Sequence, residues 1–473
     1  MDLTSPLFLF FFLPTFVLIY IISSQRLRLP IVLLASVIFL TLGQVTALLW
    51  LGSVVVVGYA LGQALSRARE NGHSGKALLW LGVGLNIGLL SFFKFTTAYG
   101  RSWLPPISGL AVPIGLSFVT FQMISYLVDV WRGNTPAEKN FLRLGTYLLF
   151  FPKLVSGPLL RYKPFAEQLD GPKPSTDDIV GGLRRLLAGF IKRILIANQL
   201  APLANAVFNL ATPNVKPLFA WLALLAFTLQ IYFDFSGYTD MAIGLGLMIG
   251  IRLPENFNYP YISQSASEFW RRWHITLSTW FREYVFFPLE RHRLKWAGQQ
   301  INIVLVFLLT GLWHGFKPTF IIWGLIYGVA IAFESAGFGR RLKNIWRPLR
   351  HLYTLAIVMA GWVFFRSDSL SFASGFFLRL AGNTDGLTML PFSKTAPLPF
   401  IEPSFVLALF VAAIFALPLF PTWNRFRAGV EGAKTSYYFV FQAAQDILLI
   451  AFFVLGLAAV VSSSFAPNLY AKF

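Results

Sequence analysis

The sequence predicts an all-α protein that crosses a lipid bilayer many times. Of its 473 residues, 56% are hydrophobic and 12% are charged, and the mean hydropathy is +0.64. A soluble domain carries roughly a quarter charged residues, so this chain has too little polar surface to face water. Because each spanning helix needs about 20 apolar residues, the length allows roughly ten to twelve spans. Transmembrane strands need alternating polarity, and the run Ile301–Leu309 does not alternate.

Apolar stretches that can form these helices recur along the whole chain. They are residues 6–23, 30–42, 46–66, 77–96, 112–131, 141–157, 217–233, 235–250, 301–315, 319–337, 350–366, 403–421 and 440–462. Pro152 and Gly157 interrupt one stretch, which favours a re-entrant or tilted helix there. No basic segment precedes Phe8–Ile22, so we expect a retained first span and not a cleaved signal peptide.

The net charge of +19 fits positive loops between spans better than a nucleic-acid surface, because no long basic run stands apart from the spans. Basic residues gather at 26–28, 67–76 and 132–139. If the first span starts outside, all three segments face the cytoplasm. The chain has no cysteine, which excludes disulfides, thiolate metal sites and a cysteine nucleophile.

The pattern predicts a single membrane domain over residues 1–473, with a core at 1–370, an active-site region at 230–316 and C-terminal hydrophobic segments at 403–462. Residues 158–200 mix Arg and Lys with apolar residues, which is typical of helices in the headgroup plane. Residues 254–297 form a second polar stretch. Residues 367–400 are rich in Gly, Ser, Thr and Pro and are expected to form a loop. No inverted repeat is visible, which disfavours a common secondary transporter.

His314 is the first candidate for chemistry. It follows an uncharged run from Ile301 to Trp313, where polar groups are costly and are usually functional. A histidine bonded to a neighbouring helix is the structural alternative. The glycines of Gly-Leu-Trp-His-Gly, residues 311–315, allow close backbone approach and so suit a ligand or a tight helix crossing. Imidazole, with an ordinary pKa of about 6.5, can accept and return a hydroxyl proton near neutral pH.

His274 lies in a second candidate segment, Glu268–Glu283. If the segment is one helix, His274, Ser278 and Arg282 recur at intervals of four residues and share a face. Its tryptophans equally suit an interfacial helix with an aromatic belt, so both interpretations stay open.

Asp234 lies in the polar stretch Tyr232–Asp240, directly after an apolar run. Two carboxylates there could act as acid and base, bind a cation or orient a histidine. We favour a structural or orienting role, because Asp at a broken-helix junction often caps backbone. We expect no metal, since no metal-ligand spacing is present, and there is no phosphate-binding glycine loop. His73 and His351 are expected to be solvated or interfacial.

Several segments together resemble the membrane-bound O-acyltransferase family, in particular its bacterial branch of alginate O-acetyltransferases and D-alanyl-lipoteichoic acid transfer proteins. The matching segments are Pro113-Ile-Gly-Leu-Ser-Phe, Phe151-Pro-Lys-Leu-Val-Ser-Gly-Pro, Tyr232–Gly246, Pro254-Glu-Asn-Phe, Glu268–Glu283, Gly311–Gly315 and Gly361-Trp-Val-Phe-Phe-Arg. The resemblance implies a ring of tilted transmembrane helices around a central funnel, with further helices in the membrane plane. It also implies that His314 is the principal catalytic residue and His274 the second.

The activity that the resemblance implies is transfer of an acetyl group across the bacterial inner membrane for O-acetylation of a cell-surface exopolysaccharide of the alginate or cellulose type. The acyl donor would be a cytoplasmic thioester such as acetyl-CoA, with no tightly bound cofactor. The expected partners are the lipid bilayer, a periplasmic acetyltransferase or acceptor protein and the exopolysaccharide machinery, with no nucleic acid. His314 would act as general base, and His274 would orient a substrate or stabilise charge.

Other candidate substrate-binding residues follow from the same segments. Arg271, Arg272 and Lys153 could steer the anionic donor, and Asp234, Ser278 and Trp313 complete the set. Residues 286–295 depart from the family pattern, because alginate-type members continue into a Gly-Gly-Asn-Arg turn after the position of Tyr284. We therefore expect a different contact with a partner or acceptor there. A transporter or flippase, or a scaffold of an export complex, remains the alternative function.

Overall fold

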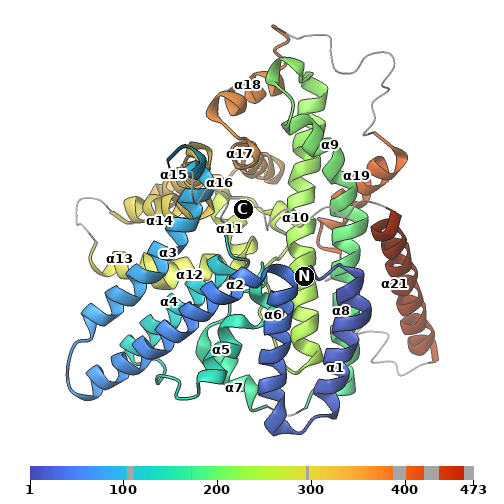
Figure 1. The fold of residues 1–473 in the computed structure, drawn as a ribbon. Coiled ribbons are helices and arrows are strands. Elements are labelled where there is room, and N and C mark those ends of the chain that lie inside the picture. The colour runs from blue at the N-terminus through green and yellow to red at the C-terminus, as the bar shows by residue number, and fades with distance from the viewer. Residues whose placement is uncertain (104–110, 172, 294–297, 387–400, 420–435, 463–473) are drawn as a thin grey trace. The chain divides into compact units, whose positions relative to one another are not determined.

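The computed structural model describes residues 1–103, 111–171, 173–293, 298–386, 401–419 and 436–462 (Figure 1). Every regular element in these ranges is a helix, and no strand occurs among them. This confirms the all-α fold class. Contacts between residues divide the chain into two compact units, described separately below.

Unit 1 comprises residues 1–189, 238–255 and 279–284. Its helices are η1 (Leu7–Phe12), α1 (Leu13–Ile22), α2 (Gln25–Glu70), α3 (Lys76–Trp103), α4 (Leu116–Arg132), α5 (Phe141–Leu149), α6 (Phe151–Leu154), α7 (Tyr162–Leu169) and most of α8 (Thr176–Ile191). The helix α2 joins two of the expected apolar stretches, with non-helical backbone at Gln44. The Gln44 side chain accepts a hydrogen bond from the backbone N–H of Ile114 at 2.8 Å, which ties this kink to the segment before α4.

Unit 2 comprises residues 190–237, 256–278 and 285–473. Its helices are η3 (Lys192–Ala197), α9 (Asn198–Phe208), η4 (Thr212–Asn214), η5 (Pro260–Ile262), α11 (Ala266–Arg272), α13 (Phe287–Arg291), α14 (Gly298–His314), α15 (Pro318–Phe333), η7 (Glu334–Phe338), α16 (Gly339–Lys343), α17 (Arg347–Arg366), α18 (Leu370–Leu380), α19 (Pro403–Phe415) and α21 (Ser436–Ser462). The helices α10 (Pro217–Met248), α12 (Ile275–Phe281) and η6 (Arg282–Phe286) run from one unit into the other.

Six helical segments among the described residues are long and apolar enough to cross a membrane. They are Gln25–Glu70, Lys76–Tyr99, Pro217–Met248, Pro318–Lys343, Arg347–Arg366 and Val440–Ser462. The length of the chain had suggested more spans, but several apolar helices are short, such as Leu7–Ile22 and Pro403–Phe415. Two pairs of expected stretches also form single helices, in α2 and α10. The chain is therefore a multi-pass membrane protein.

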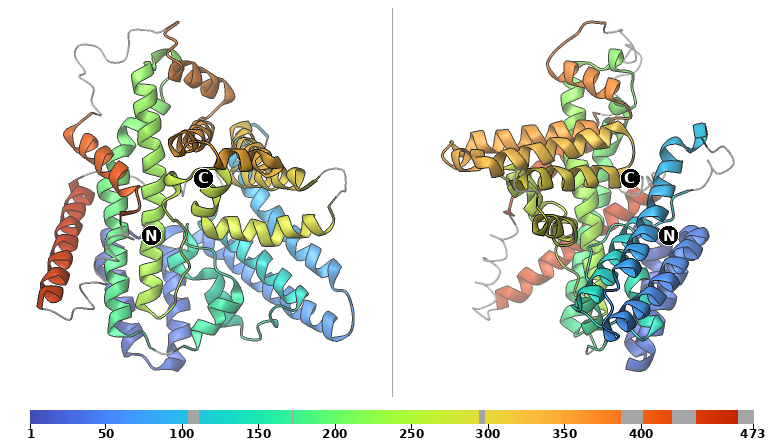
Figure 2. Two further views of the ribbon diagram at one scale, coloured as in Figure 1. Left: turned by 180° about the vertical axis from the view of Figure 1, so that it is seen from behind. Right: turned by 90° about the vertical axis from the view of Figure 1, so that its left-hand side faces the viewer.

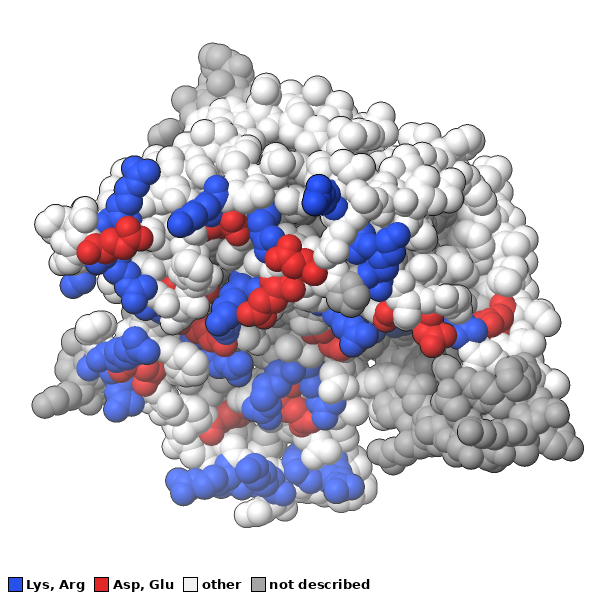
Figure 3. Space-filling model, turned by 90° about the horizontal axis from the view of Figure 1, so that it is seen from below, with Lys and Arg blue, Asp and Glu red and all other residues white. Residues whose placement is uncertain are grey.

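Many large apolar side chains lie on the surface, as expected where lipid replaces water. The most apolar window of the Val440–Ser462 segment is only 11% buried, and Val461 is 79% exposed. In the view of Figure 3, basic and acidic side chains lie close together, with uncharged residues around them.

The core of unit 2 is rich in aromatic residues and packs around α10. Phe227, Tyr232 and Phe235 of this helix are almost fully buried. They belong to one cluster with side chains of α9, α11, α15 and α17. α10 is continuous where the sequence had suggested two apolar stretches, 217–233 and 235–250.

The helices α14 and α15 form a hairpin and lie side by side in both views of Figure 2. Glycines allow their backbones to meet. A Cβ atom at Gly311 would lie 2.4 Å from the carbonyl oxygen of Phe320, and one at Gly324 would lie 2.3 Å from that of Phe307. Small residues at such crossings are typical of membrane helix pairs. The tight crossing expected beside His314 is therefore present.

Residues 367–400 contain a helix where the sequence predicted only a loop. The helix α18 starts after Ser369, whose hydroxyl accepts a hydrogen bond from the N–H of Phe372 at 3.1 Å. This cap satisfies a free backbone donor at the start of the helix. Two apolar residues of α18, Ala373 and Phe376, are buried. Residues 387–400 lie outside the described residues.

We expect Gly324→Ala to lower the free energy of unfolding by about 1–3 kcal/mol, because the added methyl group forces α14 and α15 apart. Gly88→Ala is the matched control, since nothing lies within 4 Å of a Cβ there and α3 should gain helix propensity. Melting temperatures of the detergent-solubilised variants measure the effect. Equal melting temperatures for the two would contradict a close backbone contact.

Candidate active site

The last residue of α14 is His314, and its side chain is 5% exposed. Its ring centroid lies 4.4 Å from that of Trp313, and 4.9 Å from those of both Trp323 and Phe365. Trp323 belongs to α15 and Phe365 to α17, so both neighbouring helices contribute to the surroundings. The His314 ring is thus enclosed by aromatic side chains of unit 2 and does not lie on the lipid-facing surface.

His274 lies in a sharp turn between α11 and α12. The segment Glu268–Glu283 could have formed one helix, but the structure divides it into α11 and α12. Trp273 is extended, and His274 has a φ of 43°, in the left-handed region that few residues other than glycine adopt. The face that His274, Ser278 and Arg282 would have shared in one helix is therefore lost.

Asn256 supplies the hydrogen bonds that hold this turn. Its backbone oxygen accepts from the N–H of Ile275 at 3.0 Å. Its side-chain oxygen Oδ1 accepts from both the N–H (3.1 Å) and the hydroxyl (3.0 Å) of Thr276, and it lies 3.1 Å from Nδ1 of His274. A strained backbone of this kind costs about 1–3 kcal/mol and persists where surrounding contacts impose it. The Asn256 contacts do so here.

The protonation state of His274 follows from these contacts. Because Oδ1 of Asn256 acts as an acceptor, Nδ1 of His274 carries the ring proton and Nε2 has the lone pair. Burial lowers the pKa of His274 to about 3, since water cannot solvate an imidazolium there. The ring is therefore neutral near pH 7, and its second nitrogen is a hydrogen-bond acceptor.

Asp234 lies inside the continuous helix α10, so its expected place at a broken-helix junction is wrong. Its Oδ1 accepts from Nε of Arg193 at 3.0 Å, and both side chains are almost fully buried. Arg193 is one of the basic residues expected near headgroups, but its side chain is 3% exposed. A buried ion pair of this kind breaks at high cost when one partner is removed.

Asp240, the second carboxylate of the Tyr232–Asp240 stretch, belongs to unit 1. Its Oδ1 accepts from Nη2 of Arg185 at 2.9 Å, and Glu255 binds the same guanidinium. Each aspartate of the stretch therefore has its own arginine. Among the residues that the structure describes, no group of three or more His, Cys, Asp or Glu could hold a metal ion.

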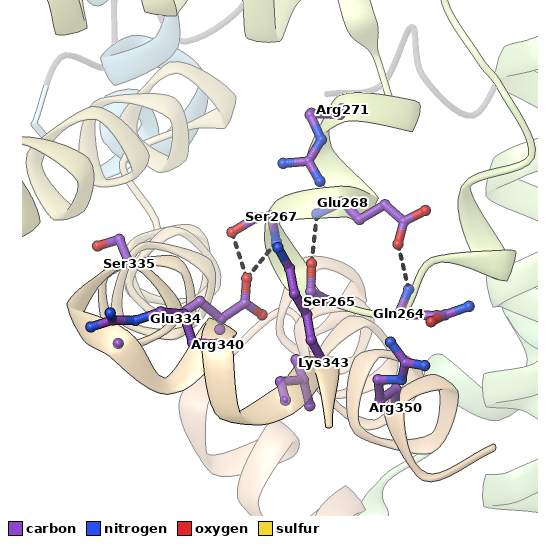
Figure 4. Close-up of a pocket in the computed structure, with 13 residues that line it drawn as sticks. Gln264, Ser265, Ser267, Glu268, Arg271, Glu334, Ser335, Arg340, Lys343 and Arg350 are labelled. Atoms are coloured by element: carbon purple, nitrogen blue, oxygen red, sulfur yellow. Dashed lines mark hydrogen bonds between the residues drawn. The ribbon is translucent and has the colours of Figure 1, made fainter. Parts of the chain in front are cut away.

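The other predicted residues of unit 2 have different surroundings. Arg271 is exposed and lines a pocket shown in Figure 4. Arg272 pairs with Glu268 at 2.9 Å, as its spacing in the sequence suggested. Ser278 is half-buried, and its hydroxyl lies 3.5 Å from the backbone oxygen of Trp273. Trp313 is half-buried beside His314.

Lys153 belongs to unit 1 and is fully buried at the end of α6. Its Nζ donates to Oε1 of Gln122 at 3.0 Å and lies 4.1 Å from the ring centroid of Tyr147. Burial lowers the pKa of Lys153 well below its usual value. The structure thus gives this lysine an interior polar partner.

A continuous series of ring contacts joins the two histidines within unit 2. From His274 it passes through Phe235, Phe257, Trp273, Trp362 and Phe365 to His314, with neighbouring centroids 4.8 to 5.7 Å apart. Both imidazoles therefore belong to one aromatic interior, where polar interactions are stronger than in water.

Sequence reasoning did not select Asn256 or Arg193 as site residues. Asn256 lies in Pro254-Glu-Asn-Phe, which entered only as a matching segment, and Arg193 was grouped with surface cations. The signal available for each was a polar residue next to apolar ones without a local partner. The local sequence does not indicate which distant residue Asn256 or Arg193 binds.

Comparison with known proteins adds to this geometry. Residues 136–371 match the model of the MBOAT, membrane-bound O-acyltransferase family. The chain is 41% identical to a probable alginate O-acetylase of Azotobacter vinelandii over 79% of this chain and 76% of that protein. It is 33% identical to a peptidoglycan O-acetyltransferase of Helicobacter pylori, over 83% and 82% of the two chains. A teichoic acid D-alanyltransferase of Bacillus subtilis is 34% identical over 52% of this chain and 65% of its own.

The match to the family model includes α10, both histidines and the α14–α15 hairpin. The alginate and peptidoglycan relatives align over most of their own length, and both are O-acyl transferring enzymes by description. Together with the apolar helices, these findings identify the chain: it belongs to the membrane-bound O-acyltransferase family and is a multi-pass membrane O-acyltransferase.

Proposed function

We propose that this protein moves an acetyl group from a cytoplasmic thioester, such as acetyl-CoA, across the bacterial inner membrane for O-acetylation of an exopolysaccharide of the alginate or cellulose type. A periplasmic acetyltransferase or acceptor protein receives the group. Relatives described as acting on alginate and peptidoglycan support this class of acceptor, because both polymers carry hydroxyl groups. The donor is a substrate and not a tightly bound cofactor.

The chemical step uses His314 as general base. The acceptor hydroxyl oxygen attacks the thioester carbonyl carbon, a C–O bond forms and the C–S bond breaks. The hydroxyl proton passes to His314 and then to the departing thiolate. The observation that carries this role is the buried His314 ring among Trp313, Trp323 and Phe365, because such a site excludes water that would otherwise hydrolyse the thioester.

His274 orients the reacting groups by accepting a hydrogen bond. Its Nδ1–H is held by Asn256, so the neutral ring offers a lone pair on Nε2 and no second N–H for a developing oxyanion. Of the two roles expected for His274, orientation therefore fits its contacts better than charge stabilisation.

The need for a membrane-embedded site follows from the charge of the donor. A nucleotide thioester is too highly charged to cross lipid, whereas an acetyl group is small and uncharged.

The divergent segment 286–295 includes the short helix α13 and exposed His292. We assign this segment to contact with the partner or acceptor.

We expect His314→Ala to reduce acetyl transfer by about 10²–10⁴-fold, which is the usual contribution of general acid–base catalysis. The measurements are polysaccharide O-acetyl content in cells and release of free coenzyme A in membranes. His73→Ala is the control, because His73 is exposed in a loop and should have no effect. Wild-type transfer by His314→Ala would refute the role. Loss of polysaccharide export with normal thioester turnover would indicate a scaffold. Movement of a substrate across the membrane without thioester turnover would indicate a transporter.

His274→Asn separates the backbone role of this residue from that of its ring. Asparagine tolerates the left-handed conformation, so we expect the variant to fold, with a melting temperature below that of wild type because the buried ring and its contact with Asn256 are lost. Loss of the imidazole should lower the turnover number by about 10- to 100-fold, comparable to the loss of a positioning contact. Full activity of a folded His274→Asn enzyme would show that the ring is dispensable.

Asn256→Asp should make activity sensitive to acid. A carboxylate opposite Nδ1 favours the imidazolium and raises the pKa of His274, so Nε2 gains a proton as pH falls and can no longer accept. The ratio of variant to wild-type turnover should therefore decrease below neutral pH. Asn258→Asp, the same change at an exposed position two residues away, should leave that ratio constant. A constant ratio for Asn256→Asp would argue against a role for the Nε2 lone pair.

A further inference from the structure

A pocket of about 580 Å³ lies in unit 2 at the start of α11 (Figure 4). Residues from three segments line it: the start and the end of α11, the junction from η7 to α16, and the start of α17. The volume falls within the range of about 300–1,000 Å³ that is typical of small-molecule sites. Of the residues that the sequence marked as candidates, Arg271 lines this space and the two histidines do not.

The pocket holds more positive than negative charge. Four cations line it, Arg271, Arg340, Lys343 and Arg350, against two carboxylates, Glu268 and Glu334. Among the described residues, none of the four cations forms an ion pair with a carboxylate. In addition, Nε of Arg350 is buried and has no hydrogen-bond partner there.

Both carboxylates of the pocket are engaged elsewhere. Glu334 accepts from the N–H groups of Ala266 (2.7 Å) and Ser267 (2.9 Å) at the start of α11, and also from the Ser267 hydroxyl. Glu268 pairs with Arg272, which does not line the pocket. Arg272 thus balances the charge of Glu268, whereas Glu334 is held by neutral donors and keeps its charge, so the four cations still give the pocket lining a net positive charge.

The charge of the connecting segment places the pocket on the cytoplasmic side. Residues 339–350 cover the end of one candidate span, the start of the next and the connection between them, and they contain five basic residues, Arg340, Arg341, Lys343, Arg347 and Arg350, with no Asp or Glu. Short loops of this kind stay in the cytoplasm. Phosphate-bearing nucleotides and anionic lipid headgroups are both available there.

We propose that this pocket binds a phosphate-bearing anion through Arg271, Arg340, Lys343 and Arg350. Guanidinium groups match phosphate oxygens with paired hydrogen bonds, and lysine adds a compact charge. The anion is either the nucleotide part of the thioester donor or an anionic phospholipid headgroup. In the first case the inference rests on the proposed function, and Arg271 links the two sites, since α11 carries it and leads directly into the His274 turn.

The test uses full-length protein in phosphatidylcholine nanodiscs, with calorimetric titration of coenzyme A and of its nucleotide bisphosphate. We expect binding to wild type, weakened about tenfold or more by Arg340→Gln/Lys343→Gln, because each charged hydrogen bond contributes roughly that factor. Arg341→Gln/Arg347→Gln removes the same charge from the same segment outside the pocket, and it should bind like wild type. Retention of phosphatidylglycerol, followed by native mass spectrometry, tests the lipid source with the same variants.

If the pocket variant loses binding of one ligand and the control variant does not, the site is supported, and the ligand that is lost identifies the source of the anion. Absence of both interactions, or equal losses in the two double variants, overturns it, because only the general surface field would then act. His314→Ala should bind the nucleotide normally. If the nucleotide does not bind but acetylation still depends on His314, only the pocket is rejected. If the nucleotide binds in the pocket but acetylation does not depend on His314, only the proposed function is rejected.

Discussion

The surroundings of His314 depend on the crossing of α14 and α15, where backbone meets backbone at Gly311 and Gly324. Lipid provides no hydrophobic force between membrane helices, so close packing and interhelical contacts hold such a pair together. Each glycine faces a carbonyl group of the other helix, at a distance that leaves no room for a side chain. The close approach brings Trp323 against the His314 ring, and α17 completes the enclosure with Phe365.

An interior of this kind accepts polar groups only in complete sets. Burying a charge or an amide without a partner costs several kcal/mol, and removing one member of a set exposes the other to that cost. Arg193 with Asp234, and Asn256 with His274, are two such sets in unit 2. Both join segments distant in the chain, so they fix α10 to η3 and the His274 turn to the segment before η5 that contains Asn256. The polar groups of the interior therefore also determine how its helices are arranged.

Composition and periodicity were sufficient to predict the helical class, the membrane and the apolar position of His314, because these depend on local residue content. The turn at His274 was not predictable in the same way. The local pattern of residues 268–283 favours one helix, and Asn256, 18 residues away, interrupts it. Likewise the polar residues around Asp234 suggested a break in α10. The helix is continuous because Asp234 pairs with Arg193, which is 41 residues distant and so is not part of the local pattern. The single membrane domain and the catalytic roles stay predictions.

One helix holds both histidine-bearing segments. Near its middle α15 meets α14, which ends in His314, and directly after its last residue Glu334 grips the first N–H groups of α11, which leads to His274. A helical rod about 15 Å long, from Gly324 to Glu334, thus connects the contact with α14 to the contact with α11. Any widening of the interior that admits a substrate must therefore move this rod as one rigid piece or break its contact with α14 or with α11. Few modes of opening are thus available to the enzyme.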